Sequence, residues 1–412
     1  MSDLECWIWF SAMRGLRCRT RNALLERFGG AKELWFADRR EIESFPGLLP
    51  DERKALTEHS TAEADRIVRS CSENHIRILT YQDAAYPERL RSIPDPPYVL
   101  YVLGELPTVD AEAVIAVVGT RKSSVYGDQM ARSIASEIAA CGGIVATGLA
   151  AGIDSRAAEG ALDAGGRVIG VLGVAINKVY PSSNAALYDR VRKNGALISE
   201  YPPDAEGSKE WFPQRNRIIA ALSLSVVVPE APERSGALIT AHRALDYGRD
   251  VFAVPSDADS PKGRGSNQLI REGAALVTRG WDVLQEYEAR FPDRLHFKEP
   301  DAAVKDTSET DFDTQDQSEK PENSFYLFRK PLRSGEAAEN GKQALLKSQL
   351  ETLTEQQLRI ISAMNAPSMH VDDIIDLAKL PASAVLSELT ILQIKGFVRQ
   401  EQGKRFTLNI SK

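Results

Sequence analysis

The regular alternation of short apolar runs with helix-like segments between residues 113 and 290 constrains the fold more than any other feature of this sequence. The runs are rich in β-branched residues and occupy residues 114–118, 144–146, 168–172, 197–199, 226–228, 251–254 and 275–277. Nearly every gap between two runs holds a segment with helical periodicity. Near-continuous apolar strands that alternate with helices are typical of a parallel sheet covered on both faces. The sequence therefore predicts an α/β fold with a Rossmann-like, doubly wound and mostly parallel sheet.

The segments before and after this stretch have different patterns and predict further domains. Residues 1–72 show helical spacing, with a Gly29-Gly30 pair that ends one helix. They are interpreted as a SAM-like or helix-hairpin-helix domain, and a small packing domain is equally compatible with them. Strand-like residues begin at 76, so the Rossmann-like domain is expected over residues 73–295. Residues 296–350 are rich in Asp, Glu, Ser, Thr and Gln and are expected to form a disordered acidic linker.

Residues 351–412 are expected to form a third folded domain. Thr354 and Gln357 have the spacing of a capping box at the start of a helix. A second helix follows, and a third is expected from Pro381 to Gly396. Two strands at 397–400 and 405–408, joined by a turn at Gln402-Gly403, would complete a winged helix.

Composition limits the classes of protein to which the chain can belong. Of its 412 residues, 43% are hydrophobic and 26% are charged, which is typical of a globular protein. The sequence has no membrane-span or signal-peptide pattern, so a cytoplasmic location is expected. The four cysteines are scattered without a CxxC pair, and no metal site is expected. The net charge of −7 means that any nucleic-acid site must be a local concentration of basic residues.

Phosphate-friendly residues follow several of the predicted strands. Residues 119–124, 148–154, 173–184, 200–217 and 230–236 contain glycines, hydroxyls and basic side chains. Ligands of an open parallel sheet bind outside the carboxyl ends of its strands, where glycine turns and helix N-termini can hold phosphate oxygens. The predicted convergence of basic residues on this edge indicates an extended polyanion as the ligand; these residues are Arg121, Lys178, Arg215 and Arg217.

Missing motifs favour binding over catalysis. The sequence has no GxGxxG after the first strand of the predicted sheet and no GxxxxGK[ST], which excludes the usual NAD and P-loop ATP sites. Asp154, Glu200 and Glu230 are candidate acids or bases, but carboxylates at loop–helix junctions more often cap backbone amides. No catalytic residue, cofactor or metal ligand is therefore assigned.

Blocks of residues in this order resemble the DNA-processing protein A family of bacteria, which is also called DprA or Smf. The blocks are VVGTR (117–121), TGLAAGID (147–154), YPSSN (180–184), SEYP (199–202), FPQRNRIIAALS (212–223), EAPERSGALITA (230–241), GRDVFAVP (248–255) and GSNQLIREGAALVT (265–278). The resemblance implies a homodimer that binds single-stranded DNA without cutting it. It also implies roles in DNA uptake, natural transformation of competent cells and recombination, where the protein protects incoming DNA and loads the RecA recombinase.

The resemblance and the loop positions together give a set of expected DNA-binding residues. They are Gly119, Thr120, Arg121, Lys122, Ser123, Gly148, Gly152, Asp154, Lys178, Tyr180, Pro181, Asn184, Arg215, Asn216, Arg217, Ser235 and Gly236. The third loop, residues 173–184, departs from the family pattern at Val174, Ala175, Asn177 and Ser182. Lys178 is expected to compensate for this less basic loop. A dimer interface is expected at an exposed edge strand over residues 274–278, with Ile270 and Leu276 in the contact. The alternative is that a helix over 281–290 covers this edge.

Two other classes of protein remain open. Nucleotide phosphoribohydrolases of the lysine-decarboxylase-like group have a similar first glycine loop. They carry a PGGxGTxxE block where this chain has residues 229–237 without a double glycine. A transcription regulator would act through the winged helix, but the candidate recognition helix over 381–395 has only Lys395 as a basic residue beside Glu388.

Overall fold

The computed structural model describes residues 1–298 and 354–408, apart from short gaps at 14, 58–59, 365–367, 382–384, 386–387, 390, 394–396 and 402–404. The chain divides between Thr307 and Ser308 into two compact units. The predicted acidic linker lies outside the described residues, except for residues 296–298. Among the described residues, no helix combines the length and apolarity needed to cross a membrane.

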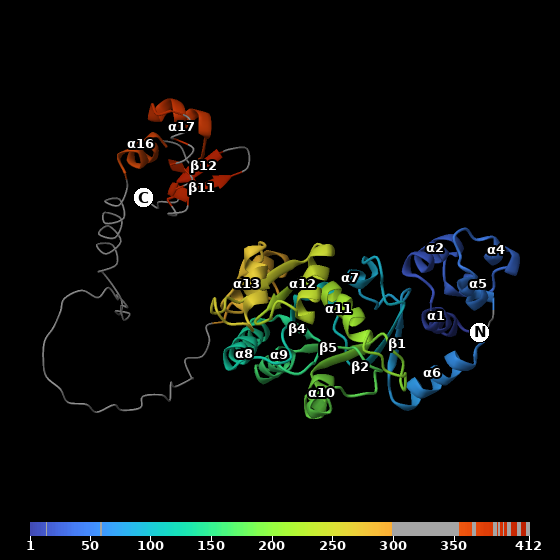
Figure 1. The fold of residues 1–412 in the computed structure, drawn as a ribbon. Coiled ribbons are helices and arrows are strands. Elements are labelled where there is room, and N and C mark those ends of the chain that lie inside the picture. The colour runs from blue at the N-terminus through green and yellow to red at the C-terminus, as the bar shows by residue number, and fades with distance from the viewer. Residues whose placement is uncertain are drawn as a thin grey trace, which may run out of the picture. The chain divides into compact units, whose positions relative to one another are not determined.

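A nine-stranded sheet forms the centre of the first unit, in the order β1-β2-β6-β5-β4-β3-β7-β8-β9 (Figure 1). The strands are β1 (Arg77–Thr80), β2 (Val99–Gly104), β3 (Val114–Val117), β4 (Ile144–Thr147), β5 (Val168–Leu172), β6 (Gly195–Ser199), β7 (Ser225–Val228), β8 (Asp250–Ala253) and β9 (Ala275–Leu276). Strands β3 to β9 pair in parallel, whereas β1 and β2 are added antiparallel at one side. The predicted doubly wound, mostly parallel sheet is confirmed.

Helices cover both faces of the sheet because alternate strand residues point to opposite sides. Ile115 and Val117 belong to the core that contains α8 (Val125–Ala140), α9 (Ile153–Asp163) and α10 (Ala185–Lys193). Val114 and Ala116 belong to a second core that contains α11 (Trp211–Leu222), α12 (Gly236–Asp246) and α13 (Arg264–Arg271). In Figure 1, α8 to α10 lie below the sheet and α11 to α13 above it.

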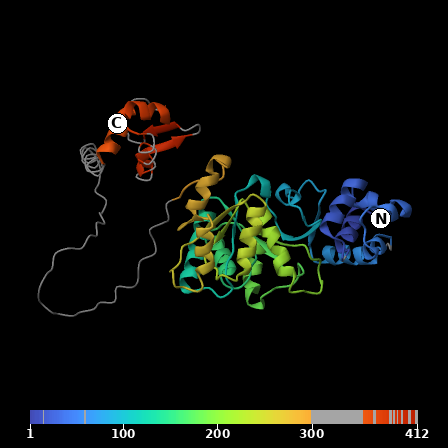
Figure 2. The same cartoon turned by 45° about the horizontal axis from the view of Figure 1, so that its top comes forward.

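Residues 1–73 form a helical domain that packs beside β1 and β2 (Figure 2). Its helices are α1 (Asp3–Ala12), α2 (Cys18–Phe28), α3 (Ala31–Trp35), α4 (Arg39–Ser44), α5 (Pro50–Thr57) and α6 (Ala62–Glu73). Gly29 ends α2 with φ of +91°, as the sequence predicts. Phe10 of α1 packs edge-on against Tyr98 with 5.1 Å between ring centroids, and Asn22 Nδ2 donates to the Pro94 carbonyl at 2.8 Å. Aromatic packing and hydrogen bonds thus join the two domains.

The segment after β9 completes the first unit. Helix α14 (Trp281–Leu284) and the short helix η3 (Gln285–Arg290) follow the last strand, and Val283 and Leu284 are buried. Phe297 packs on Trp281 with 5.3 Å between ring centroids. The packed chain therefore continues at least to Phe297.

The second unit has a small core of its own. The capping box of Thr354 and Gln357 starts α16 (Glu355–Ala363), which confirms that prediction. Helix α17 (Val371–Ala378) follows, and the sheet order is β10-β12-β11, from β10 (Ser368–His370), β11 (Val398–Glu401) and β12 (Arg405–Leu408). Residues 385, 388–389 and 391–393 are helical, and Pro381 is not. The other residues of the predicted third helix, with its terminal Gly396, lie outside the described residues. The turn at Gln402-Gly403 also lies outside them.

Candidate nucleic-acid interface

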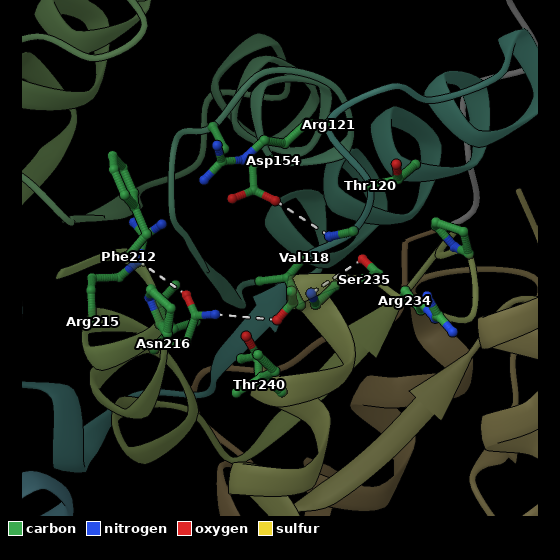
Figure 3. A pocket seen from close by; sticks show the side chains of 18 of the residues that line it. Val118, Thr120, Arg121, Asp154, Phe212, Arg215, Asn216, Arg234, Ser235 and Thr240 are labelled. Atoms are coloured by element: carbon green, nitrogen blue, oxygen red, sulfur yellow. Dashed lines mark hydrogen bonds between the residues drawn. The ribbon is translucent and has the colours of Figure 1, made fainter. Parts of the chain in front are cut away.

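The topology of the sheet creates a crevice beside β3. Strand β3 pairs with β4 on one side and with β7 on the other. The connection that follows β3 runs through α8 on one face of the sheet, and the connection that follows β7 runs through α12 on the other face. Such a switch in strand order leaves an opening at the carboxyl edge of a parallel sheet. A pocket of about 520 Å³ lies at this point, lined by residues that follow β3, β4 and β7 and by the start of α11 (Figure 3).

The loop after β3, residues 119–124, forms one wall of this pocket and is held by two carboxylates. Asp154 Oδ1 accepts from the Gly119 amide at 3.3 Å, and its other oxygen accepts from the Gly148 amide at 3.1 Å. Glu230 accepts from both the amide and the hydroxyl of Ser124, at 2.7 and 2.6 Å. Both side chains are almost fully buried. Asp154 and Glu230 therefore fix the loop by binding backbone amides, as predicted, whereas Glu200, the third candidate, pairs with Arg217.

Close backbone packing brings the loop after β4, residues 148–154, against the loop after β3; these are the second and the first glycine loop. Gly152 has φ of +79°, and a Cβ atom at this position would lie 2.4 Å from the Thr120 carbonyl oxygen. Only glycine can meet both requirements without strain. Burial raises the pKa of Asp154, while the charge of Arg215 and the amide hydrogen bonds act to lower it. The two glycine loops therefore form one rigid base of the pocket.

Helix α11 presents Phe212, Arg215 and Asn216 to the pocket from one face, because positions i, i+3 and i+4 of a helix lie together. Arg215 is buried, and its Nη1 donates to the carbonyls of Gly148, at 2.8 Å, and Val171. Burial lowers the pKa of Arg215. Its Nε donates to Asn216 Oδ1 at 3.2 Å. Since Nη1 is bound to backbone carbonyls, Arg215 holds the second glycine loop in place.

An exposed cation and two aromatic rings line the mouth of the pocket. The Arg121 guanidinium carbon lies 5.1 Å from the ring centroid of Phe212, and the Tyr180 ring lies 5.1 Å from the same ring. Arg121 and Tyr180 are exposed. This arrangement offers a bidentate phosphate donor beside flat apolar surfaces that can stack on bases.

The opposite wall is the N-terminus of α12. The Ser235 hydroxyl accepts from the Ala237 amide at 3.2 Å, and Asn216 Nδ2 donates to the Gly236 carbonyl at 3.2 Å. Arg234 is exposed on this wall (Figure 3). Lys209, from the segment before α11, completes the lining. The positive end of the α12 dipole and two basic side chains therefore face the same hollow.

The structure brings nine of the predicted site residues together in the lining: Gly119, Thr120, Arg121, Asp154, Tyr180, Arg215, Asn216, Ser235 and Gly236. Gly148 and Gly152 support this lining through the contacts described above. Asn184 ties the third loop to the second by donating to the Leu149 carbonyl at 3.0 Å. Pro181 follows Tyr180 in the third loop, and Lys122 and Ser123 continue the first loop beyond the pocket.

Arg217 and Lys178 do not line the pocket. The Arg217 side chain is only 11% exposed and pairs with Glu200 at 2.7 Å and with Asp95 at 3.4 Å. Burial acts to lower the pKa of Arg217, but the two carboxylates outweigh it and raise this pKa. Lys178 is exposed and donates to the Ala205 carbonyl at 3.1 Å. Arg217 is held in its ion pairs, so its predicted place in the lining is wrong, whereas DNA contact by the exposed Lys178 stays a prediction.

Of the lining residues that are missing from the predicted set, three are aromatic or charged: Phe212, Lys209 and Arg234. The signal for Phe212 was present, since it stands three and four positions before Arg215 and Asn216 on the same helix. Arg234 stands directly before the predicted residue Ser235. Nothing in the sequence marks Lys209.

Fold and pocket together define a class of protein: a Rossmann-like α/β protein with a basic, glycine-lined pocket at the switch point of its sheet, followed by a second, smaller α/β unit. The family model of DNA recombination-mediator protein A matches residues 77–288, and that of the DprA winged helix domain matches residues 346–404. The chain belongs to the DNA-processing protein A (DprA/Smf) family, and its second unit is a winged helix.

Relatives from several bacteria support this assignment. Protein Smf of Synechocystis sp. is 30% identical over 98% of both chains. DNA processing protein DprA of Bacillus subtilis is 37% identical over 64% of this chain and 82% of its own length. The X-ray structure of DprA from Streptococcus pneumoniae superimposes with a TM-score of 0.62 at 32% identity, over 69% of this chain and 98% of that one.

Proposed function

We propose that this protein binds single-stranded DNA in the pocket at the switch point and holds it without cutting it. The observation that carries the proposal is the placement of the Arg121 guanidinium beside the rings of Phe212 and Tyr180. A guanidinium suits a phosphodiester, and an aromatic ring suits a base. The names of the relatives, DNA processing proteins, agree with this ligand class.

The aromatic mouth favours a single strand over a duplex. Bases can stack on side chains only where they are not paired and stacked on each other. Phe212 and Tyr180 come from different elements and meet at the pocket mouth, so a base that reaches them has left any helical stack. The chain carries a net charge of −7, so attraction to DNA has to come from a local group of cations. In the pocket these are Arg121, Lys209 and Arg234.

The state of the carboxylates supports binding without strand cleavage. Asp154 is the lining carboxylate and already accepts two backbone amides, and Glu230 behind the loop accepts from Ser124. A general base needs a free oxygen near the reacting group. Across the described part of the chain, no three His, Cys, Asp or Glu side chains gather as a metal-binding group.

The wider role follows the family resemblance and is part of the proposal. The protein would protect incoming single strands during natural transformation and load RecA on them. It would act as a homodimer through the edge of the sheet at β9. Leu276 is 54% exposed on this edge strand although α14 and η3 follow it, so these helices do not cover it.

A titration of labelled single-stranded and duplex oligonucleotides at several salt concentrations tests the proposal. With roughly three to five phosphates contacted, log K should fall against log salt with a slope of about −2 to −3.5 for the single strand. Arg121→Ala should weaken binding and reduce the magnitude of the slope by about 0.7, the value for one phosphate contact. Arg40→Ala, at an exposed arginine of the helical domain, is the matched control and should change neither quantity.

Equal affinity for duplex and single strand, or an unchanged slope for Arg121→Ala, would contradict the proposal. The competing enzymatic class has its own assay. Incubation with nucleoside monophosphates should release no free base if the protein only binds.

A further inference from the structure

The carboxyl edge of the sheet continues beyond the pocket, on the side of β8. The loop after β8, residues 254–263, contacts both the end of the loop that follows β3 and the first turn of α8. Lys262 Nζ donates to the Ser123 carbonyl at 3.0 Å, and the Tyr126 hydroxyl donates to the Pro255 carbonyl at 2.8 Å. These contacts place a tyrosine and a lysine directly after the Arg121 end of the pocket.

Tyr126 presents a fixed aromatic ring to solvent. Its side chain is 43% exposed, and the preceding Val125 is 76% exposed. The hydrogen bond to Pro255 anchors the hydroxyl, so the ring is held at one end and its apolar surface stays accessible. Neither residue lines the pocket, and neither packs in the core clusters of the sheet. Exposed, anchored aromatic rings of this kind suit the stacking of unpaired bases.

Two exposed ammonium groups accompany this ring. Lys122 and Lys262 are both exposed and flank Ser123 from its own loop and from the neighbouring one. Asp128, the acidic side chain that contacts Ser123, is already bound to the Ser123 hydroxyl and to Arg156. The charges of Lys122 and Lys262 therefore remain available to a phosphate.

The acidic group that opposes a phosphate here is Asp257. Partial burial raises the pKa of Tyr126, and the charges of Asp257 and Glu230 add to this effect. Glu230 is buried and bound to Ser124, whereas Asp257 is exposed. The charge of Asp257 therefore opposes a phosphate close to Tyr126.

We propose that Tyr126 is a second base-stacking position, and that Lys122 and Lys262 neutralise the phosphate between it and the pocket. This inference rests on the proposed binding of single-stranded DNA and names the path of the strand beyond the pocket. The path leads from Tyr180 and Phe212 across Arg121 to Tyr126. In the sheet order this is the direction from β5 through β3 to β8, toward the exposed edge strand β9.

Strand length separates the two positions in an experiment. Full-length protein is titrated with oligothymidylates of about 4 and about 16 nucleotides, which bracket the site sizes of single-strand-binding domains. Tyr126→Ala should weaken binding of the longer strand by about 5- to 100-fold, as expected for loss of one stacked base, and leave the shorter strand within about twofold. Tyr126→Phe keeps the ring and should bind both strands as the unchanged protein does.

Charge variants provide a second, independent readout. Lys262→Gln should reduce the magnitude of the salt slope for the longer strand by about 0.7. Asp257→Asn should strengthen binding of the longer strand. Phe36→Ala, at a 64% exposed aromatic residue of the helical domain, is the matched control and should change nothing.

The outcomes distinguish this inference from the function on which it rests. If Tyr126→Ala binds the longer strand normally while Arg121→Ala is weakened, the second position is wrong and the pocket stands. If Arg121→Ala binds both strands normally, the proposed function itself fails. Equal weakening of both strands by Tyr126→Ala, with a lower melting temperature, would show a structural role for the ring and overturn the inference.

Discussion

Arg215 and Arg217 of α11 show how two residues of one type, two positions apart, can have different roles. A helix turns about 100° per residue, so side chains at i and i+2 point about 200° apart. Arg215 faces the pocket and holds the glycine loop, whereas Arg217 faces Glu200 and Asp95 near the helical domain. Arg217 therefore acts as a positioning residue that fixes the back of the helix carrying Phe212.

Substitution of Arg217 tests this assignment. Arg217→Gln removes one member of a buried ion pair and should destabilise the fold by about 3 kcal/mol, because it leaves Glu200 without its partner. The salt slope of single-strand binding should not change, since no phosphate contact is lost. Thermal melts and salt titrations measure the two effects separately. A slope reduced by about 0.7 would show instead that Arg217 contacts a phosphate.

Residue placement is the level at which the sequence was least informative. Residues directly after β3, such as Arg121, could be predicted because strand ends and glycine turns mark the edge of a sheet. Arg217 could not be assigned, because its partner Asp95 lies 122 positions earlier in the chain, in the bend before β2. Lys178 likewise depends on the position of a loop around Ala205. Contacts between distant loops decide these cases.

Among the elements, the start of α2 depends on one buried carboxylate of α5. Glu52 is 2% exposed and accepts from Arg17 Nε at 2.9 Å, from the Leu49 amide at 2.9 Å and from the Thr20 hydroxyl at 3.3 Å. The hydrogen bonds from Arg17 lower the pKa of Glu52 to about 2, against the opposing effect of burial. The ionised carboxylate thus joins α5 to the chain before α2.

This low pKa predicts acid sensitivity of the helical domain. A carboxyl group whose pKa is depressed by folding stabilises the protein above its unfolded pKa, and this contribution is lost as the pH falls toward the folded value. Glu52→Gln should cost roughly 1–2 kcal/mol at pH 7, after allowance for solvent around the half-exposed Arg17. In thermal melts the difference from the unchanged protein should shrink between about pH 4.5 and pH 2.

Glu43→Gln is the control for this experiment, since its pair with Arg39 is exposed and should contribute little at any pH. A difference for Glu52→Gln that stays constant down to pH 2 would contradict the role of the ionised form.

The edge strand β9 carries the prediction about assembly. Leu276→Arg places a charge on an exposed residue of an unprotected edge, so it should convert the proposed homodimer into a folded monomer. The monomer should still bind short oligonucleotides, because the pocket lies at the carboxyl edge near β3. Light scattering gives the mass, and a thermal melt shows whether the variant is folded. A stable dimer, or a collapsed melt, would each refute the edge interface.

Strands could be predicted well from the sequence where every residue of the run is buried. Runs such as 168–172 coincide with β5 because β-branched residues buried on both faces have no helical alternative. Strand β9 is only two residues long and exposed, so its pattern is weaker. The spatial order of the strands is absent from local patterns, because β3 pairs with β7 across 110 residues.

At the scale of the whole molecule, the winged helix is expected to contribute little to DNA binding. Residues 351–412 contain seven Lys and Arg against seven Asp and Glu. A neutral domain adds little long-range attraction to DNA. Removal of residues 345–412 should therefore leave the affinity for single strands within about threefold and the salt slope unchanged. The same titration checks this result, and a large loss of affinity would move the main site to the winged helix.

The position of β3 between β4 and β7 also has a consequence for the chain as it leaves the ribosome. One wall of the pocket is complete once residues 119–154 have been made, but the other, at residues 232–240, arrives only after β7 has paired with the free side of β3. Domains form as units, and contacts distant in sequence form late. A nascent chain that has not yet reached β7 therefore has only one of the two walls of the pocket. We expect the complete pocket to form only after β7 has paired with β3.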